Sequence, residues 1–219
     1  MVDDVTIAVM RCPHCGAELA GLDQDVVFFC RNCICGYEIG ANSRFRKLSF
    51  VSQSPPENVK PSSLLWLPMW ALKVSTEISA SGKEKKLIKR ILEDCPWVWV
   101  TAYRTWRPSY FGDPGLLYTS KSIVPEMKKP EEEGAPAGCA LREIEATQYP
   151  MPFLLSIVDR HIDVASIDIH TEIIESKLVA VPFIYEGDRI KDTQMEWEWP
   201  PIFVEDIVSL RYMADRIPR

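Results

Sequence analysis

Two short stretches, Cys12-Pro13-His14-Cys15-Gly16 and Cys30-Arg31-Asn32-Cys33, indicate how the N-terminal part of this chain folds. In a Cys-x-x-Cys segment the backbone turns so that both thiolates are directed at one point, and Gly16 allows the positive φ that such a turn uses. Two of these turns supply four sulfur ligands, which complete a tetrahedral set around one metal ion. The pattern predicts a closed metal site with the ligands Cys12, Cys15, Cys30 and Cys33.

The segment between the two cysteine pairs has the pattern of a small hairpin. Residues 18–20 and 26–29 are predicted as short strands, joined by a polar turn over 21–25. A unit of this size buries too little apolar surface to fold unaided, so we expect the bound metal to hold it together.

The motifs CPHCG and CRNC resemble those of zinc ribbons, the rubredoxin-like class, over about the first 40 residues. The resemblance implies Zn²⁺ in a structural site, with iron as the alternative, because four thiolates hold either metal. In one place the sequence departs from the class, since Ile34-Cys35 intervenes before Gly36, whereas ribbons usually place glycine directly after the second pair. Cys35 is therefore an alternative to Cys33 as the fourth ligand.

The overall layout also resembles that of prokaryotic proteins without an assigned activity that carry an N-terminal zinc ribbon. This resemblance implies a fold and no activity. A Trp-Leu-Pro-Met-Trp segment at residues 66–70 opens the part of the chain that follows the ribbon.

Composition predicts a soluble globular protein of the cytoplasm. The 219 residues are 47% hydrophobic and 26% charged, which excludes disorder of the whole chain. The apolar stretch 64–72 is too short to cross a bilayer, and the start of the chain lacks the basic region of an export signal. Most of the seven cysteines lie between Cys12 and Cys35, which favours metal ligation in a reducing compartment over a disulfide framework.

Segments rich in breaker residues divide the chain. Residues 52–63 are dense in Pro, Ser and Asn, and are predicted to link a ribbon domain over 1–51 to a main domain over 64–219. A second stretch, 125–138, is rich in Pro and Glu and is predicted to be an exposed, mobile loop inside the main domain.

The main domain combines strand and helix patterns. β-branched, aromatic or alternating residues predict strands over 64–78, 97–106, 167–174, 178–185 and 195–199. Apolar spacing and capping residues predict helices over 83–94, 114–120, 140–147 and 205–216. Because strands do not alternate regularly with crossover helices, the predicted class is α+β, with a mainly antiparallel sheet packed on one face by helices.

The sequence carries no signature of catalysis or nucleotide binding, since GxxxxGK[ST], GxGxxG and GxSxG are all absent. We therefore expect a non-catalytic binding or scaffold protein that docks a protein partner or a second copy of itself. Trp is enriched at binding hot spots, and two Trp residues spaced by two in a strand share a face. The interface candidates are Trp66, Trp70, Trp197 and Trp199.

Other functions stay open as alternatives. Iron in the same four-thiolate site would make a one-electron carrier. Many zinc ribbons contact nucleic acid, but a net charge of −6 argues against a general electrostatic hold on phosphates. The basic cluster within residues 83–90 is interpreted as a solvated helix face, with peripheral membrane contact as its alternative.

Overall fold

The computed structural model describes residues 10–22, 24–40, 44–79, 82–103, 114–126, 128–130, 134–136, 138–165, 167–186, 189–195 and 197–199. Its strands form two sheets, one of three strands near the N-terminus and one of six strands in the rest of the chain. The predicted helix 205–216 and the end of the predicted strand 97–106 lie outside the described residues.

The small sheet carries the second cysteine pair. Strand β1 (Val27–Cys30) pairs antiparallel with β2 (Cys35–Ile39), which pairs antiparallel with β3 (Phe45–Leu48). The predicted strand over 18–20 is reduced to isolated bridges, one of them between Ala20 and Phe29. The main partner of β1 is therefore β2, a strand that the sequence analysis did not predict.

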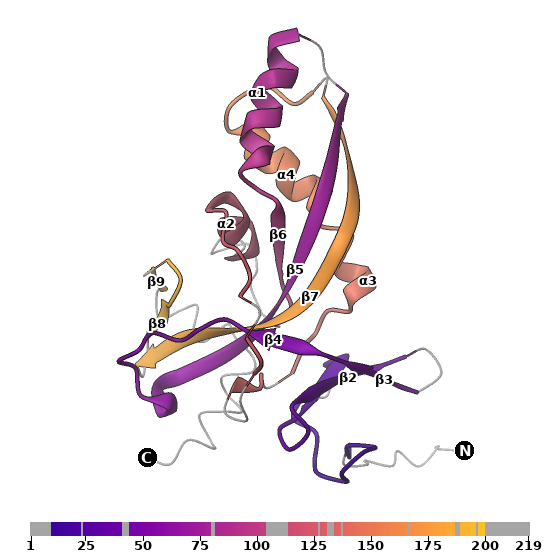
Figure 1. Cartoon of the computed structure of the whole chain (residues 1–219), viewed down its shortest axis with the longest axis vertical. Helices are drawn as coiled ribbons and strands as arrows, with labels where there is room; N and C mark the ends of the chain where they lie inside the picture. Colours follow the sequence, from indigo (N-terminus) through magenta and orange to yellow (C-terminus); the bar gives the residue numbers. More distant parts are fainter. Residues whose placement is uncertain are drawn as a thin grey trace, which may run out of the picture.

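Two long strands form the axis of the large sheet. Strand β5 (Leu64–Ser79) pairs antiparallel with β7 (Asp168–Glu186) over almost its whole length, and the two run side by side through most of the molecule (Figure 1). The sheet order is β6-β5-β7-β8-β9, with β6 at Trp97–Thr101, β8 at Arg189–Asp192 and β9 at Glu198–Trp199. Strand β4 (Phe50–Ser52) adds a short parallel pairing to β7. The predicted α+β class with a mainly antiparallel sheet is confirmed.

Two prolines lie inside the central strands, Pro68 in β5 and Pro182 in β7. The carbonyl of Pro68 accepts a hydrogen bond from the backbone N–H of Ala102, and the carbonyl of Pro182 accepts one from the Thr193 hydroxyl. Because N–H and C=O of one strand residue point to the same side, both ring nitrogens face away from the β5–β7 ladder. The ladder between the two long strands therefore loses no hydrogen bond to these prolines.

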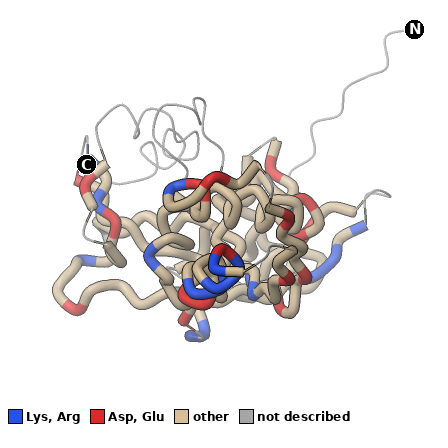
Figure 2. The backbone as a smooth tube through the Cα atoms, turned by 90° about the horizontal axis from the view of Figure 1, so that it is seen from above, with Lys and Arg blue, Asp and Glu red and all other residues tan. Residues whose placement is uncertain are grey.

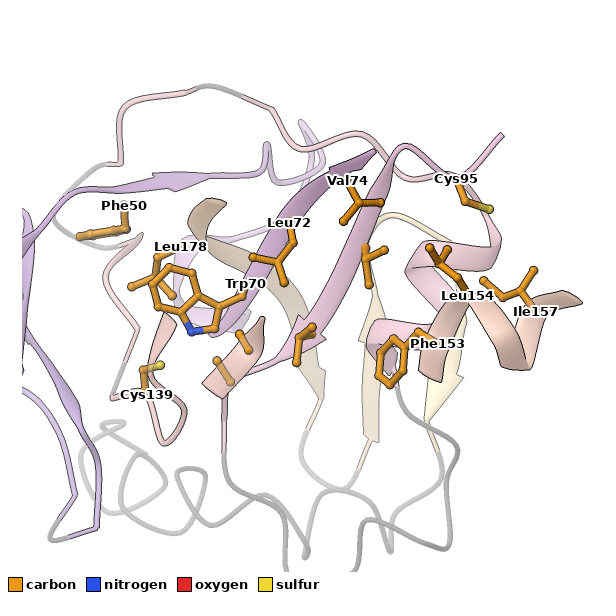
Figure 3. Close-up of a cluster of buried hydrophobic side chains, with 14 of the residues drawn as sticks. Phe50, Trp70, Leu72, Val74, Cys95, Cys139, Phe153, Leu154, Ile157 and Leu178 are labelled. Atoms are coloured by element: carbon orange, nitrogen blue, oxygen red, sulfur yellow. The ribbon is translucent and has the colours of Figure 1, made fainter. Parts of the chain in front are cut away.

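Side chains from both faces of the large sheet are buried. One face packs against α1 (Gly82–Glu93), α3 (Glu143–Ala146) and α4 (Pro150–Asp159), and Figure 3 shows part of this cluster around Trp70, Leu72 and Leu154. The opposite face, which carries Trp97 and Trp99, packs against Tyr118 of α2 (Pro114–Ser120). The expectation that helices cover one face only is wrong, because these tryptophans need their own apolar cover.

The helix predictions differ in outcome. Helices α1 and α2 confirm the predictions over 83–94 and 114–120, and α3 is a shorter form of the predicted 140–147. Helix α4 was not predicted. In the part of the chain that the structure describes, no helix combines the length and the apolar character that crossing a membrane requires.

The small sheet packs against the core of the large sheet through side chains of β1. Val27 and Phe29 point into the core that contains Trp70 and Leu178, whereas Phe28 and Cys30 belong to the cluster around the first cysteine pair. Backbone hydrogen bonds of 2.9 and 3.0 Å join Val27 to Cys139. The division of the chain at residues 52–63 stays a prediction.

Arg46 also connects the small sheet to the rest of the molecule, through ion pairs at the surface. The Arg46 guanidinium on β3 lies 2.6 Å from the Glu38 carboxylate on β2 and 3.1 Å from the Glu143 carboxylate on α3. The arginine therefore joins the small sheet to helix α3, and these carboxylates raise the pKa of Arg46 through hydrogen bonds.

Candidate metal centre

Four cysteine sulfurs meet at one end of the small sheet. Cys12 and Cys15 come from the loop before β1, Cys30 ends β1, and Cys33 lies in the turn between β1 and β2. The four Sγ atoms all lie within 4.8 Å of one another. The structure thus brings together the residues that the two motifs predicted, from segments about 15 residues apart in the chain.

The sulfur spacing fits a tetrahedral metal ion. The Sγ atoms of Cys12 and Cys33 are 3.8 Å apart, and those of Cys15 and Cys30 are 3.5 Å apart. A tetrahedron with metal–sulfur bonds of about 2.3 Å has edges of about 3.8 Å between its sulfurs. The four residues could therefore hold one metal ion without a large rearrangement of their backbones.

The first turn is built by its own backbone. The N–H of Gly16 donates to the carbonyl of Cys12 at 2.9 Å, and the N–H of Cys12 donates to the carbonyl of Ala17 at 2.7 Å. Gly16 has a φ of +74°, in the left-handed region where a side chain is strained. This conformation lets the chain fold back so that Cys12 and Cys15 face the same point.

The second turn repeats this design with one difference. The backbone N–H of Cys33 donates to the Cys30 sulfur at 3.4 Å, which favours the thiolate that a metal needs. The residue that follows Cys33 is Ile34, and it has a φ of +50°. A β-branched residue is rarely found in this region. The turn therefore accepts Ile34, where zinc ribbons usually have glycine, at the cost of local backbone strain.

Cys35 lies outside the group of four sulfurs. It begins β2, is buried, and pairs across the sheet with Cys30 in the backbone register. Among the described residues, the set of possible metal ligands contains Cys33 and not Cys35. The geometry therefore favours Cys33 as the fourth ligand.

Tyr37 is a neighbour of the site that the sequence analysis missed. Its hydroxyl lies 3.4 Å from the Cys12 sulfur, in a buried position. Burial raises the pKa of the Cys12 thiol, but the Tyr37 hydroxyl and the backbone N–H groups of Cys15 and His14 outweigh it and lower the pKa to about 6. Cys12 is therefore prepared to be a thiolate at neutral pH.

The four cysteines of the site differ in their exposure to solvent. Cys12 and Cys30 are buried among Leu19, Phe28 and Tyr37, whereas Cys15 is exposed. The site is thus closed by protein on one side and lies close to solvent on the other. With four thiolates no coordination position is left for a substrate, so this arrangement suits a structural role.

The tryptophans proposed for an interface have different environments. Trp70 is buried in the core and its indole N–H donates to the carbonyl of Leu141, and Trp199 is also buried. Trp197 is 51% exposed and stacks on Trp199 with ring centroids 6.3 Å apart. Trp66 is partly buried at the wall of a cavity. Of these four side chains, Trp197 is thus exposed and Trp66 partly exposed, whereas Trp70 and Trp199 are buried.

A second feature that the sequence did not reveal is a buried carboxyl in the large sheet. The Tyr118 hydroxyl donates to Asp192 at 2.6 Å, and the backbone N–H groups of Gln194 and Met195 donate to the other carboxyl oxygen. Burial raises the pKa of Asp192 against the opposing effect of these hydrogen bonds. The pair joins α2 to β8 and has no access to solvent, which indicates a structural role.

Comparison of the chain with known protein families, with curated proteins and with solved structures finds no match.

Proposed function

We propose that this chain is a non-catalytic binding protein, stabilised by one zinc ion on Cys12, Cys15, Cys30 and Cys33, that docks a protein partner. The observation that supports the metal most directly is the group of four sulfurs within 4.8 Å of one another. Closed four-thiolate sites are predominantly structural zinc sites, which favours zinc over iron and a structural over a redox role.

The proposed docking residue is Trp197. Its exposed ring is held in place by stacking on buried Trp199, with an angle of 21° between the two ring planes. An ion pair between Arg189 of β8 and Glu198 of β9, with N and O 2.7 Å apart, includes the residue next to Trp197 in the chain. A large aromatic side chain that is already fixed loses little conformational freedom on binding, and a polar rim is typical of interfaces.

The distribution of charge supports a protein partner over nucleic acid. Basic and acidic residues are interspersed along the described backbone in the view of Figure 2, and the chain has a net charge of −6. A nucleic-acid site normally requires a concentrated basic surface. All seven cysteines are free of disulfides, which supports a reducing, cytoplasmic location.

Native mass spectrometry of the protein isolated from its own source tests both parts of the proposal. We expect one zinc ion per chain and a retained protein partner. The variant Trp197→Ala should keep the zinc and lose the partner, whereas Ile174→Ala, at an exposed apolar residue of β7, should keep both. Bound iron, recognised by its visible absorbance, would instead support electron transfer as the function of the metal site. A partner that stays bound to the Trp197 variant would contradict the docking site.

A further inference from the structure

One edge of β5 is free beyond the point where β6 ends. Strand β6 pairs with residues 69–73 of β5, and the backbone N–H of Val74 then donates to the carbonyl of Pro96 at 3.1 Å. Within the part of the chain that the structure describes, residues 75–79 of β5 pair on one side only, with β7. The two long strands thus continue past β6, toward the end of the molecule that carries α1 (Figure 1).

Backbone groups of this free segment point away from β7. Successive residues of a strand direct their N–H and C=O groups to opposite edges, and the carbonyl of Pro68 and the N–H of Val74 both face β6. The bulge in the β5–β7 pairing has its additional residue, Ile174, in β7, so the alternation along β5 is regular. The N–H and C=O groups of Thr76 and Ile78 therefore face the free edge, where no described group bonds to them. Such groups are a template for another strand.

A groove of about 570 Å³ lies at this edge, between β5 and α1. Glu77 and Ile78 both line it although they belong to opposite faces of β5, which places the groove at the edge of the strand. Leu92 of α1 adds an apolar wall, and Pro96, directly before β6, lines the groove as well. The groove therefore continues the position of β6 along β5, with backbone partners on one side and an apolar wall on the other.

The face of the two long strands that lies opposite α1 carries carboxylates without basic partners. Glu77 pairs with His170 in the register, and Asp168 and Glu172 share its face through the alternation of β7. All three acidic residues are exposed, and none forms an ion pair with another residue that the structure describes. His170 makes no hydrogen bond or ion pair with Glu77 either. This outer face thus favours a basic side chain on a strand added beside β5.

The charges on the α1 side of the groove are balanced. The Lys89 ammonium lies 3.6 Å from the Glu93 carboxylate, and Lys85 is exposed to solvent on the same helix. Alternate side chains of an added strand would point to α1 and to the outer face in turn. Charge complementarity therefore acts on the outer face, and apolar contact with Ile78 and Leu92 acts on the α1 side.

We propose that this edge of β5 binds an extended segment of a partner protein by strand addition, with a lysine or arginine opposite Glu77 and an apolar residue on either side of it. Backbone hydrogen bonds to Thr76 and Ile78 supply the attachment, and the alternating side chains supply specificity. Two copies of this chain paired here would bring their acidic faces side by side, which disfavours a second copy as the occupant. The groove contains neither the four cysteines nor Trp197, so this proposal and the proposed function can fail separately.

An NMR titration of the isotope-labelled full chain with the peptide acetyl-Thr-Val-Lys-Val-Thr-amide tests the proposal. We expect a dissociation constant of about 1 mM and amide shifts concentrated at Thr76 and Ile78. N-methylation of both valines removes the peptide N–H groups that would face β5, and it should abolish binding. N-methylation of the lysine alone is the matched control, because its N–H would face away from β5, and binding should persist.

Variants of β5 test the same contacts from the protein side. Thr76→Pro removes one outward N–H and leaves the ladder to β7 intact, as Pro68 does in the same strand, so binding should weaken at least about tenfold. Thr76→Val keeps this N–H and should bind like the wild type, with circular dichroism to verify the folding of both variants. A peptide with glutamate in place of lysine should bind about fivefold more weakly, and Glu77→Gln should reduce this difference.

Several results would overturn the proposal. It fails if the lysine peptide shifts no amide of residues 75–79, if the peptide methylated at its valines binds as well as the unmodified one, or if the glutamate peptide binds as tightly as the lysine peptide. Amide shifts at Thr76 and Ile78 that depend on protein concentration without peptide would identify a second copy as the occupant instead. The methylated peptides, tested on the wild type, decide the matter if Thr76→Pro does not fold.

Discussion

Gly16 and Ile34 occupy the same position in the two cysteine turns, each directly after its Cys-x-x-Cys pair, and both have a left-handed backbone with φ of +74° and +50°. The backbone conformation is thus set by the geometry of the turn and not by the residue that adopts it. Ile34 has this conformation although a β-branched residue is strained in it, and its side chain packs against the main core. Strain and packing therefore oppose each other at this residue.

The first prediction separates these two effects at Ile34. Ile34→Gly and Ile34→Ala both remove the packing, but only glycine relieves the strain. We expect Ile34→Gly to be more stable than Ile34→Ala by about 1 kcal/mol, measured by urea denaturation with zinc present. At Lys47, in the exposed strand β3, the order should be reversed, with Ala more stable than Gly. The same order at both positions would contradict a strained Ile34.

The second prediction concerns the Tyr37 hydroxyl. Tyr37→Phe removes the hydrogen bond that lowers the pKa of Cys12, so protons compete more strongly with the metal for this sulfur. We expect zinc affinity to fall about tenfold, as measured by competition with a chromogenic chelator. The loss should be greater at pH 6 than at pH 8, because more of the thiol is then protonated. Tyr149→Phe, on the exposed surface before α4, should not change the affinity.

The third prediction follows from the attachment of β1 to Cys139. Metal removal should loosen the small sheet and break its hydrogen bonds to Cys139, whose thiol is fully buried and has a raised pKa because of this burial. We expect a chelator to accelerate alkylation of Cys139 by iodoacetamide at least about tenfold, as followed by peptide mass spectrometry.

Cys95 is the internal control for this experiment. It is also buried, but it packs at the end of α1, and the labelled positions of Cys95 and Cys139 lie well apart in Figure 3. Its alkylation rate should not change on metal removal. Equal acceleration of both cysteines would indicate global unfolding and not a local release of the small sheet.

The fourth prediction concerns pH and the buried carboxyl of Asp192. Its folded pKa is raised above the ordinary value of 3.8, so the folded protein binds this proton more strongly than the unfolded chain does. Its contribution to stability is fully present below pH 3.8 and is lost as the pH rises through the folded pKa.

Asp192→Asn tests this dependence because it cannot titrate. Relative to the wild type, the free energy of unfolding of the variant should increase with pH, by about 1.4 kcal/mol for each pH unit between the two pKa values. Urea denaturation from pH 4 to pH 8 measures the difference. A difference between Asp192→Asn and the wild type that does not change with pH would refute the prediction.

The elements that could be predicted from the sequence are those with a strong local pattern. Strands β5 and β6 have continuous apolar and aromatic residues, and α1 has apolar residues spaced for one buried face. Helix α4 was not predicted, because Pro150 and Pro152 are residues that usually end a helix. Proline is nevertheless tolerated in the first turn, where these two residues lie. Strand β7 was predicted as two strands, because the polar residues 175–177 interrupt its apolar pattern while the long pairing with β5 continues through them.

At the metal centre, too, only the features that depend on local sequence could be predicted. The four cysteines follow from spacing alone, because each turn is local. The contact between Tyr37 and Cys12 depends on the register of β2 against β1, for which the sequence gives no local signal. The cavity beside Trp66 is lined by segments that lie far apart in the chain, so no motif could identify it.

The two prolines inside β5 and β7 also limit how far the outer strands of the large sheet can pair. Pro68 and Pro182 offer a carbonyl but no N–H on the sides that face Ala102 and Thr193. The ladder between β5 and β6 ends at Met69, and the ladder between β7 and β8 ends at Phe183, in each case one residue from a proline. The prolines therefore set where the outer strands stop, without interrupting the pairing of the two long strands.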